Sequence, residues 1–300
     1  MKSPKQTRIE FPNLDKVVID ALNLFKKSKL PKLNLKYKRP LVVGSGNAAV
    51  TGRIIFANKD AVFADEGNYK QKLKTIKNID GAILISASGE KHAPIIAKDL
   101  KKRKIETVLI TNNPTAEANQ FVIKSFFYPK NTEPYTYNTS TYMGMILGKT
   151  RESPQKILNQ IKKIKRLRNL KKFNAFYIIV PTEFDNVREL FLTKFDELFG
   201  PMINGRVFTI EQTKHAKTVV PSDKEFFIGL GYNNKSFGKK QNRLNITLPK
   251  KAGPATVMAI GYYIIGHIQK QHPDYFKNHI TNYTRQASKM FGSTIKPIVD

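Results

Sequence analysis

The sequence contains no cysteine and no tryptophan, and its acidic residues are few: 23 Asp and Glu stand against 52 Lys and Arg. Without cysteine, the chain forms no disulfides or thiolate metal sites and has no Cys nucleophile. It also lacks any apolar run of the roughly 18 residues that a membrane-spanning helix needs. The first residues, Met1–Lys5, are not followed by the apolar stretch that is typical of a secretory signal. We therefore expect a soluble, cytoplasmic protein that does not enter membranes.

The formal net charge is +29, which is compatible with a nucleic acid, an acidic surface or a phosphorylated ligand as partner. The lysines are spread along the chain. Their densest clusters, residues 98–104 and 162–172, lie on helix-like patterns, where charge usually makes a solvated face. No RNP-type aromatic motif, zinc-finger spacing or Arg-rich tail accompanies them. Nucleic-acid binding is therefore possible but not favoured.

Short apolar runs alternate with amphipathic segments, which predicts parallel sheets covered by helices on both faces. The α/β pattern restarts after the basic stretch at 162–172. We therefore predict two doubly wound α/β domains, residues 1–168 and 169–300. Apolar spacing predicts helices over 13–28, 48–58, 68–77, 92–103, 138–150, 154–168, 184–198, 254–269 and 275–290. It predicts strands over 41–43, 61–64, 82–85, 106–110, 175–180, 207–209, 226–230 and 244–248.

Two loops that follow predicted strands carry glycine and hydroxyl side chains, and ligands of open parallel sheets bind at such strand ends. The first is Gly44-Ser45-Gly46-Asn47, where glycines allow close backbone approach and the following helix N-terminus favours an anion. The second is Ser86-Ala87-Ser88-Gly89-Glu90-Lys91, whose hydroxyls, backbone N–H groups and lysine suit a phosphate monoester. When this loop is taken alone, simple helix capping is the favoured interpretation by a modest margin, because serine is a preferred N-cap and Glu90 suits a first turn.

A third segment, residues 133–141, places Glu133 beside Thr139, Ser140 and Thr141 and suits recognition of a polyol. The alternative is a helix start capped by Asn138 or Thr139. In the second half, Glu211 and His215 form a pair capable of proton transfer near neutral pH, although such residues are more often on the surface. We interpret His267, His272 and His279 as structural. No His, Asp and Glu set has metal-ligand spacing, so we expect no metal and no cofactor.

In this order, the three segments resemble the sugar isomerase (SIS) domain family. That family has a glycine-rich first loop, a Ser-x-Ser-Gly-x-Thr loop, and a Glu with a hydroxyl-rich turn before the last helix. The strand at 106–111, followed by Asn112, fits the family's I-x-I-T-N strand. The chain then looks like two tandem SIS domains. This is the layout of bifunctional phosphoglucose/phosphomannose isomerases and of the isomerase part of glucosamine-fructose-6-phosphate synthase.

The resemblance implies a phosphosugar isomerase that acts on a hexose or amino-hexose phosphate, and a homodimer, because pockets in the family are often completed across a dimer interface. Lys91 stands where the family has Thr, which keeps a charge for the phosphate but changes the hydrogen-bond geometry. Ala48 stands where a hydroxyl is common, and Ser45 is the substitute. The phosphate would be held by three residues of the second loop: Ser86, Ser88 and Gly89.

Aldose–ketose isomerisation needs a base that moves a proton between C1 and C2 through an enediolate. The resemblance implies Glu197 as this base, with Glu211 as the fallback. It implies His215 for opening the sugar ring. It also implies Lys296 near the C-terminus as the cation that stabilises the oxyanion, with Lys289 as an alternative.

Three other hypotheses stay open. A non-catalytic phosphosugar-binding or regulatory protein is suggested by the departures at Ala48 and Lys91. A nucleic-acid-binding protein rests on the charge alone. A dinucleotide oxidoreductase rests on Gly44-x-Gly46-x-x-Ala49 and on Asp65, which stands where a ribose-binding acid would lie.

Overall fold

The computed structural model describes residues 10–164 and 167–300. The first half contains α1 (Leu14–Lys27), β1 (Leu41–Val43), α2 (Asn47–Ile55), β2 (Val62–Ala64), α3 (Tyr69–Thr75), β3 (Ala82–Ile85), α4 (His92–Lys102), β4 (Thr107–Thr111), η1 (Glu117–Phe121), β5 (Lys124–Phe127), β6 (Glu133–Pro134), α5 (Thr139–Thr150) and α6 (Pro154–Lys162). The second half contains η2 (Leu170–Lys172), β7 (Ala175–Val180), η3 (Thr182–Val187), α7 (Arg188–Phe199), η4 (Gly200–Met202), β8 (Asn204–Thr209), α8 (Ile210–Lys214), β9 (Glu225–Leu230), η5 (Lys240–Asn242), β10 (Arg243–Ile246), α9 (Pro254–Gln271), α10 (Tyr275–Phe291) and β11 (Ile298–Val299).

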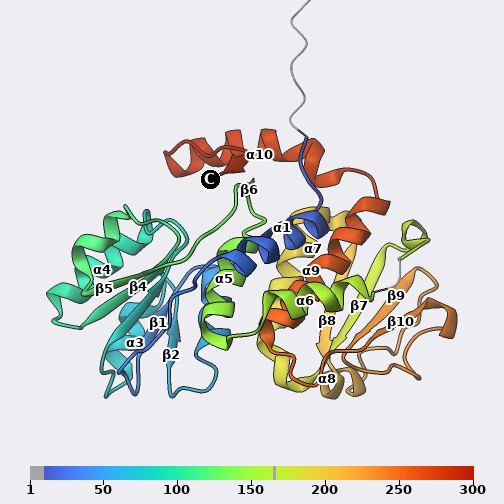
Figure 1. Cartoon of the computed structure of the whole chain (residues 1–300), viewed down its shortest axis with the longest axis horizontal. Helices are drawn as coiled ribbons and strands as arrows, with labels where there is room; N and C mark the ends of the chain where they lie inside the picture. The colour runs from blue at the N-terminus through green and yellow to red at the C-terminus, as the bar shows by residue number, and fades with distance from the viewer. Residues whose placement is uncertain (1–9, 165–166) are drawn as a thin grey trace, which may run out of the picture.

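Two parallel sheets lie side by side with helices between and around them (Figure 1). The first has the order β2-β1-β3-β4-β5 and the second the order β10-β9-β7-β8. Near the C-terminus, β11 pairs antiparallel with β6. Parallel neighbours need crossover connections, and these place helices on the sheet faces. The predicted fold class, α/β with parallel sheets flanked by helices, is confirmed.

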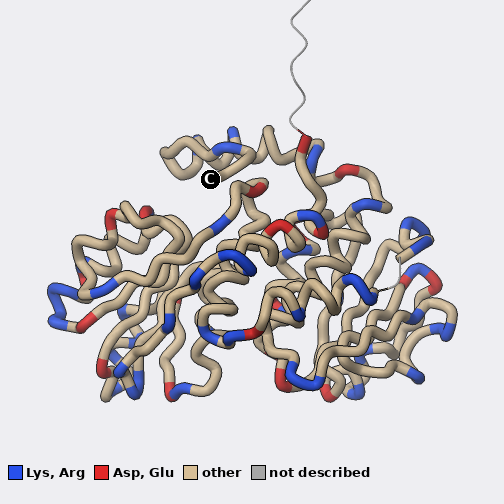
Figure 2. The backbone as a smooth tube through the Cα atoms, viewed as in Figure 1, with Lys and Arg blue, Asp and Glu red and all other residues tan. Residues whose placement is uncertain are grey.

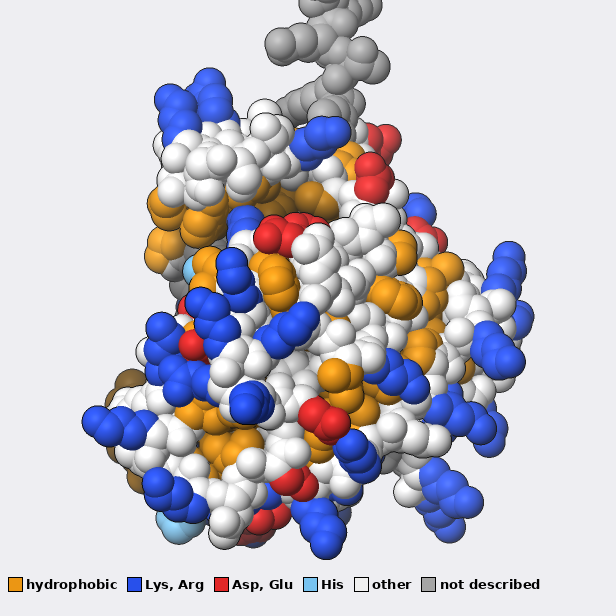
Figure 3. Space-filling model, turned by 90° about the vertical axis from the view of Figure 1, so that its left-hand side faces the viewer, with side chains coloured by type: hydrophobic (Ala, Val, Ile, Leu, Met, Phe, Trp, Pro, Cys, Tyr) orange, Lys and Arg blue, Asp and Glu red, His pale blue; other side chains and the backbone are white. Residues whose placement is uncertain are grey.

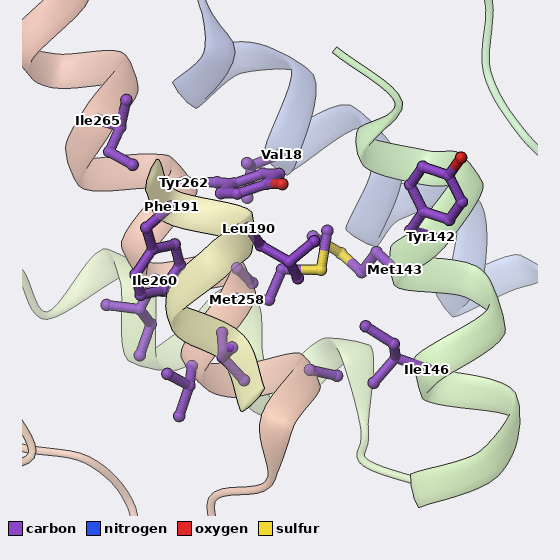
Figure 4. Packing of buried hydrophobic residues seen from close by; sticks show 14 of the residues in the cluster. Val18, Tyr142, Met143, Ile146, Leu190, Phe191, Met258, Ile260, Tyr262 and Ile265 are labelled. Carbon is purple, nitrogen blue, oxygen red and sulfur yellow. The ribbon is translucent and has the colours of Figure 1, made fainter. Parts of the chain in front are cut away.

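One hydrophobic cluster occupies the space between the sheets and takes residues from α1, α2, α5, α7 and α9. Figure 4 shows Met143 of α5, Leu190 of α7 and Met258 of α9 meeting in this cluster. Helices α1 and α9 approach closely at Gly266, where a Cβ atom would lie 2.0 Å from the backbone nitrogen of Asp15. Because the cluster crosses residue 168, the domain boundary at 168/169 stays a prediction.

The outer faces of the two sheets are covered differently. Helices α3 and α4 cover the first sheet, where Tyr69 and Leu100 pack in a second cluster. On the second sheet a small cluster is built on Tyr177 and Phe227, with Ile210 of α8 and Phe237 from the loop before β10 packed against it. The first half therefore provides the more regular three-layer unit.

Most predicted elements are confirmed within a few residues, and the differences have local causes. Strand β5 was not predicted because it is an edge strand in which only Phe126 is buried. Helix α6 ends at Lys162 rather than at 168, and residues 165–166 lie outside the described residues. Gln271 at the end of α9 donates to the Leu167 carbonyl and accepts from the Leu170 N–H. These hydrogen bonds hold the segment after α6 against α9. Helix α7 begins at Arg188 because residues 182–187 form a 3₁₀ turn.

In the described part of the chain, none of the helices has the length and apolar character required to cross a membrane.

Candidate functional site

The first two loops meet at one edge of the first sheet, because β1 and β3 are neighbouring parallel strands whose carboxyl ends lie together. They surround a cavity of about 310 Å³. Tyr135 and Tyr142 close the cavity from the side of the third segment. The loop residues that line it are Gly44, Ser45, Ala48, Ser86, Ala87, Ser88, Glu90 and Lys91.

The first loop turns tightly into α2. A Cβ atom at Gly44 would lie 2.7 Å from the backbone carbon of Ala48, so only glycine fits there. Gly46 has a φ of +53° at the start of α2. The Ser45 hydroxyl donates to the carboxylate of Glu66, which follows β2. An anion that used this hydroxyl would therefore have to displace a carboxylate.

The second loop is organised by its own serines. The Ser86 hydroxyl oxygen accepts from the Gly89 N–H at 3.1 Å, and the Ser88 hydroxyl oxygen accepts from the Glu90 N–H at 3.3 Å. Gly89 has a φ of +66° and packs so closely that its Cβ would lie 2.4 Å from Ala116. Among the residues that the structure describes, neither hydroxyl donates a hydrogen bond, so both can donate to a ligand. Neither serine caps α4, whose N-cap residue Lys91 makes no side-chain cap bond, so the capping interpretation is wrong and the serines hold the loop itself.

Lys91 ends the second loop and is the N-cap residue of α4. Its backbone φ is +37°, a conformation that residues other than glycine rarely adopt, and its side chain makes no cap bond. His92 and Ala93, the first residues of α4, also border the cavity, so the positive end of the α4 dipole lies beside it. This edge of the cavity is suited to an anion.

The third segment serves mainly to start α5. The Glu133 carboxylate is buried and accepts from the N–H groups of Thr139 and Ser140 at 2.7 and 2.6 Å, and from the Ser140 hydroxyl. Burial raises the pKa of the Glu133 carboxyl, and these hydrogen bonds oppose the rise. Asn138 is the N-cap residue but makes no side-chain cap bond. Thr141 is buried as well, so this segment reaches the cavity through Tyr135 and Tyr142 instead.

A second cavity of about 790 Å³ lies beyond Tyr135, between the end of α7 and α10. Glu197 lines it together with Thr136. The Glu197 carboxylate accepts from the ammonium of Lys194, which also donates to the Thr136 carbonyl oxygen at 2.7 Å. Burial raises the pKa of the Glu197 carboxyl, and the Lys194 ammonium opposes the rise. Lys194 is the residue that sequence reasoning missed; its place three residues before Glu197 was the available signal.

The backbone between the two cavities is strained at Thr136, a β-branched residue with a φ of +77°. Its hydroxyl oxygen is buried with no hydrogen-bond partner among the described residues. Tyr135 lines the first cavity, whereas Thr136 lines the second one together with Glu197, so this segment borders both cavities.

Glu211 and His215 are exposed and lie at α8 and the turn after it. Glu211 pairs with Lys214. Figure 1 shows α8 at the lower edge of the molecule and α10 along the upper edge. The first cavity borders α10, because the Lys91 ammonium lies 4.4 Å from the centroid of the Phe291 ring. Within one chain, the fold therefore does not bring His215 to the described lining of either cavity.

The C-terminal segment returns to the site. Pairing of β11 with β6 brings Pro297 beside Tyr135, whose N–H donates to the Pro297 carbonyl at 2.8 Å. Lys296, the residue before Pro297, is exposed next to this contact. Lys289 is exposed on α10.

The remaining candidates are in other environments. Asp65 accepts from the N–H groups of Gly67 and Asn68 and so forms the turn before α3. Asn47 is buried in α2, and its side-chain oxygen has no hydrogen-bond partner among the described residues. His272 bridges the carbonyls of Ile268 and Phe173, as expected of a structural histidine. In residues 10–164 and 167–300, no three His, Asp or Glu side chains gather as metal ligands.

Lys and Arg positions are spread along the backbone of both halves (Figure 2). The aromatic rings of Tyr177 and Phe227 on the second sheet are buried, so they offer no open surface for stacking bases.

The fold is similar to solved structures over most of the chain. Glucosamine-6-phosphate deaminase from Thermotoga maritima matches with a TM-score of 0.59 and 17% identity, covering 85% of this chain and 93% of that chain. The C-terminal domain of glucosamine-fructose-6-phosphate aminotransferase from Francisella tularensis matches with a TM-score of 0.56 and 12% identity, covering 86% and 93%. Tagatose-6-phosphate ketose/aldose isomerase from Escherichia coli matches with a TM-score of 0.55 and 9% identity, covering 86% of each chain.

No family model and no curated protein sequence matches this chain. At these identities, the likeness to solved structures shows the fold. The resemblance to the sugar isomerase family is thus supported at the level of the fold, and the tandem-domain layout stays a prediction.

Proposed function

We propose that this chain binds a sugar phosphate in the cavity between the first two loops, with the phosphate on residues 86–91. The observation that carries this proposal is the meeting of two small-residue loops and the N-terminus of α4 around one cavity of about 310 Å³. Two free hydroxyl protons and the Lys91 ammonium supply the donors for a dianion. The names of the similar structures, which include amino-sugar and ketose phosphates, support the same ligand class.

The finer proposal is isomerisation of a hexose or amino-hexose phosphate. The base would take a proton from C2 of the aldose and return it to C1, which leaves a ketose and needs no co-reactant. Glu197 is the proposed base, since its raised pKa brings it closer to neutral pH. Lys296 is the proposed cation for the enediolate oxygen. Phosphate binding at the second loop would supply remote binding energy for positioning the reacting carbons.

Ring opening by His215 requires a second copy of the chain, because His215 directly follows α8 at the lower edge of the molecule, whereas the first cavity borders α10 along the upper edge (Figure 1). We therefore propose a homodimer in which the partner supplies the imidazole. Glu211 stays the fallback base under the same arrangement.

One observation favours a second candidate, a non-catalytic sugar-phosphate-binding protein. Glu197 lines the neighbouring cavity, behind Tyr135 and Thr136, and is held by Lys194. If this arrangement persists with ligand bound, the chain binds without turnover.

Ligand-dependent thermal unfolding tests the binding proposal, because a ligand that binds only the folded state raises its apparent stability. Glucosamine 6-phosphate, fructose 6-phosphate and inorganic phosphate would be compared at equal ionic strength. We expect a sugar phosphate to stabilise the chain more than phosphate does, and Ser88→Ala to reduce that shift. Ser236→Ala is the matched control, since Ser236 is exposed on a loop of the second half.

Stabilisation by a DNA duplex alone, fading at high salt, would overturn the sugar-phosphate proposal in favour of nucleic-acid binding. An isomerase assay then separates the two sugar-phosphate candidates. The enzyme loses turnover but keeps binding in Glu197→Gln, whereas the non-catalytic protein has no turnover to lose.

A further inference from the structure

Helix α10 carries one apolar stripe whose two halves have different surroundings. Near its start, Phe276 and Ile280 are buried, and α10 packs against α7. Further along the same stripe, Tyr283 is 50%, Met290 76% and Phe291 52% exposed. Figure 1 shows α10 running along the top of the molecule toward the first half. Hydrophobic side chains gather on the underside of this uppermost part, above a hollow (Figure 3).

The open half of α10 reaches the rim of the first cavity through two contacts. The ring centroids of Tyr283 and Tyr135 are 6.3 Å apart, and Tyr135 lines that cavity. The Lys91 ammonium lies over the ring of Phe291, the last residue of α10, at 4.4 Å from the ring centroid. The last turn of α10 is thus attached to the loop proposed to hold the phosphate.

Within the described residues, no carboxylate pairs with the exposed Lys91 ammonium, and its contact is with the Phe291 ring. A contact between a cation and an aromatic face at an exposed position is weaker than a charge-assisted hydrogen bond to a phosphate oxygen. A phosphate on the second loop would therefore draw the ammonium away from the ring. Lys91 itself lines the cavity, so its ammonium can reach an anion bound there.

We propose that Phe291 and a bound anion compete for the Lys91 ammonium, so that anion binding frees the Phe291 ring at the end of α10. Phe291 acts as a positioning residue: in the absence of an anion it holds the ammonium at the rim of the first cavity and so lowers the affinity of the cavity for anions. This inference rests on the proposed function, because it requires an anion on residues 86–91. It adds a link between ligand binding and the contacts of the last turn of α10.

A double-mutant cycle with inorganic phosphate as the probe tests the competition. Phe291→Leu keeps an apolar side chain without the aromatic face, so we expect it to tighten phosphate binding about two- to fivefold. Lys91→Met should weaken binding at least about tenfold. In the Lys91→Met background, Phe291→Leu should leave the dissociation constant unchanged, because no ammonium remains to compete for. Thermal unfolding of each variant without phosphate checks that the fold is intact.

The absence of tryptophan allows a direct reporter of the release. In Phe291→Trp, the introduced indole is the single tryptophan of the chain and keeps an aromatic face for Lys91. We expect its fluorescence to change on addition of phosphate at constant ionic strength. The same change should be missing when Lys91→Met is combined with Phe291→Trp.

The outcomes separate this inference from the proposed function. If phosphate binds but Phe291→Leu does not tighten binding, or its effect persists without Lys91, the competition is wrong and the ligand site stands. If neither phosphate nor glucosamine 6-phosphate binds the wild-type chain, the proposed function and this inference both fail.

Discussion

Lys194 and Glu197 lie one turn apart on α7 and form an ion pair whose ammonium is fully buried, whereas 23% of the carboxylate side chain is exposed to the larger cavity. The same ammonium holds the Thr136 carbonyl and acts electrostatically on the buried Glu133 carboxyl. Lys194 of the second half therefore interacts with the Glu197 carboxylate on its own helix and, in the first half, with the Glu133 carboxyl and the strained Thr136 backbone. The Lys194 ammonium thus joins the segment at 133–141 to Glu197, the candidate base.

Removing this ammonium should be costly. Lys194→Met leaves the Glu197 carboxylate and the Thr136 carbonyl without their buried partner, and we expect a loss of about 3–5 kcal/mol in the free energy of unfolding. Chemical denaturation measures it. Lys214→Met is the matched control, because Lys214 and Glu211 have the same sequence spacing but are exposed. That variant should lose less than about 1 kcal/mol. Equal losses in both variants would show that burial of Lys194 is not the cause.

The Glu197 carboxyl should make stability depend on pH in a defined direction. Burial raises its pKa, so the folded chain holds the proton more tightly than the unfolded chain does. Its stabilising contribution is fully present below the ordinary glutamate pKa of about 4.3 and is lost as the pH rises through the raised value. We therefore expect the wild type to lose stability relative to Glu197→Gln as the pH rises from about 4.

Denaturation of both proteins between about pH 4 and 8 gives this difference directly. Glu211→Gln, at an exposed pair, controls for the loss of any glutamate. A difference that grows in the opposite sense would mean that the Lys194 ammonium outweighs burial and holds the pKa below its usual range.

Because α1 and α9 approach closely at Gly266, any larger side chain there should destabilise the fold. Alanine normally stabilises a helix interior relative to glycine by about 1 kcal/mol. At Gly266, however, the added Cβ would meet backbone atoms of Asp15 at 2.0 and 2.7 Å, so a helix must shift. We expect Gly266→Ala to destabilise the chain by about 1–3 kcal/mol, measured by denaturation. At Gly67 a Cβ meets only a side-chain oxygen at 3.3 Å, so Gly67→Ala should be nearly neutral.

If the chain is a dimeric isomerase, two inactive variants should complement each other. Ser88→Ala damages the proposed phosphate loop, and His215→Ala removes the imidazole proposed to come from the partner. After unfolding and refolding together, half of the dimers are mixed and each mixed dimer has one intact site. We expect about a quarter of wild-type activity from the mixture. If both residues act within one chain, the mixture stays inactive.

Several features could be predicted from local sequence because their causes are local. Apolar periodicity located β1, β3 and α9, since burial of a strand or of one helix face imposes its own spacing. The loops at 44–47 and 86–91 could be placed at strand ends for the same reason, and the structure brings both to one cavity. Strand β6 escaped prediction because a two-residue strand has no period to detect.

The amino-acid sequence by itself determined the alternation of strands and helices, the small-residue loops that follow β1 and β3, and the excess of positive charge. Only the tertiary structure decided that the Lys194 ammonium reaches the Thr136 carbonyl, that β11 pairs with β6, and that the Lys91 ammonium lies against the Phe291 ring. The reason is physical. Local patterns follow from the repeat of each element, whereas these contacts depend on how distant elements pack. Lys91 and Phe291 are 200 residues apart in the chain, and no local spacing encodes such a contact.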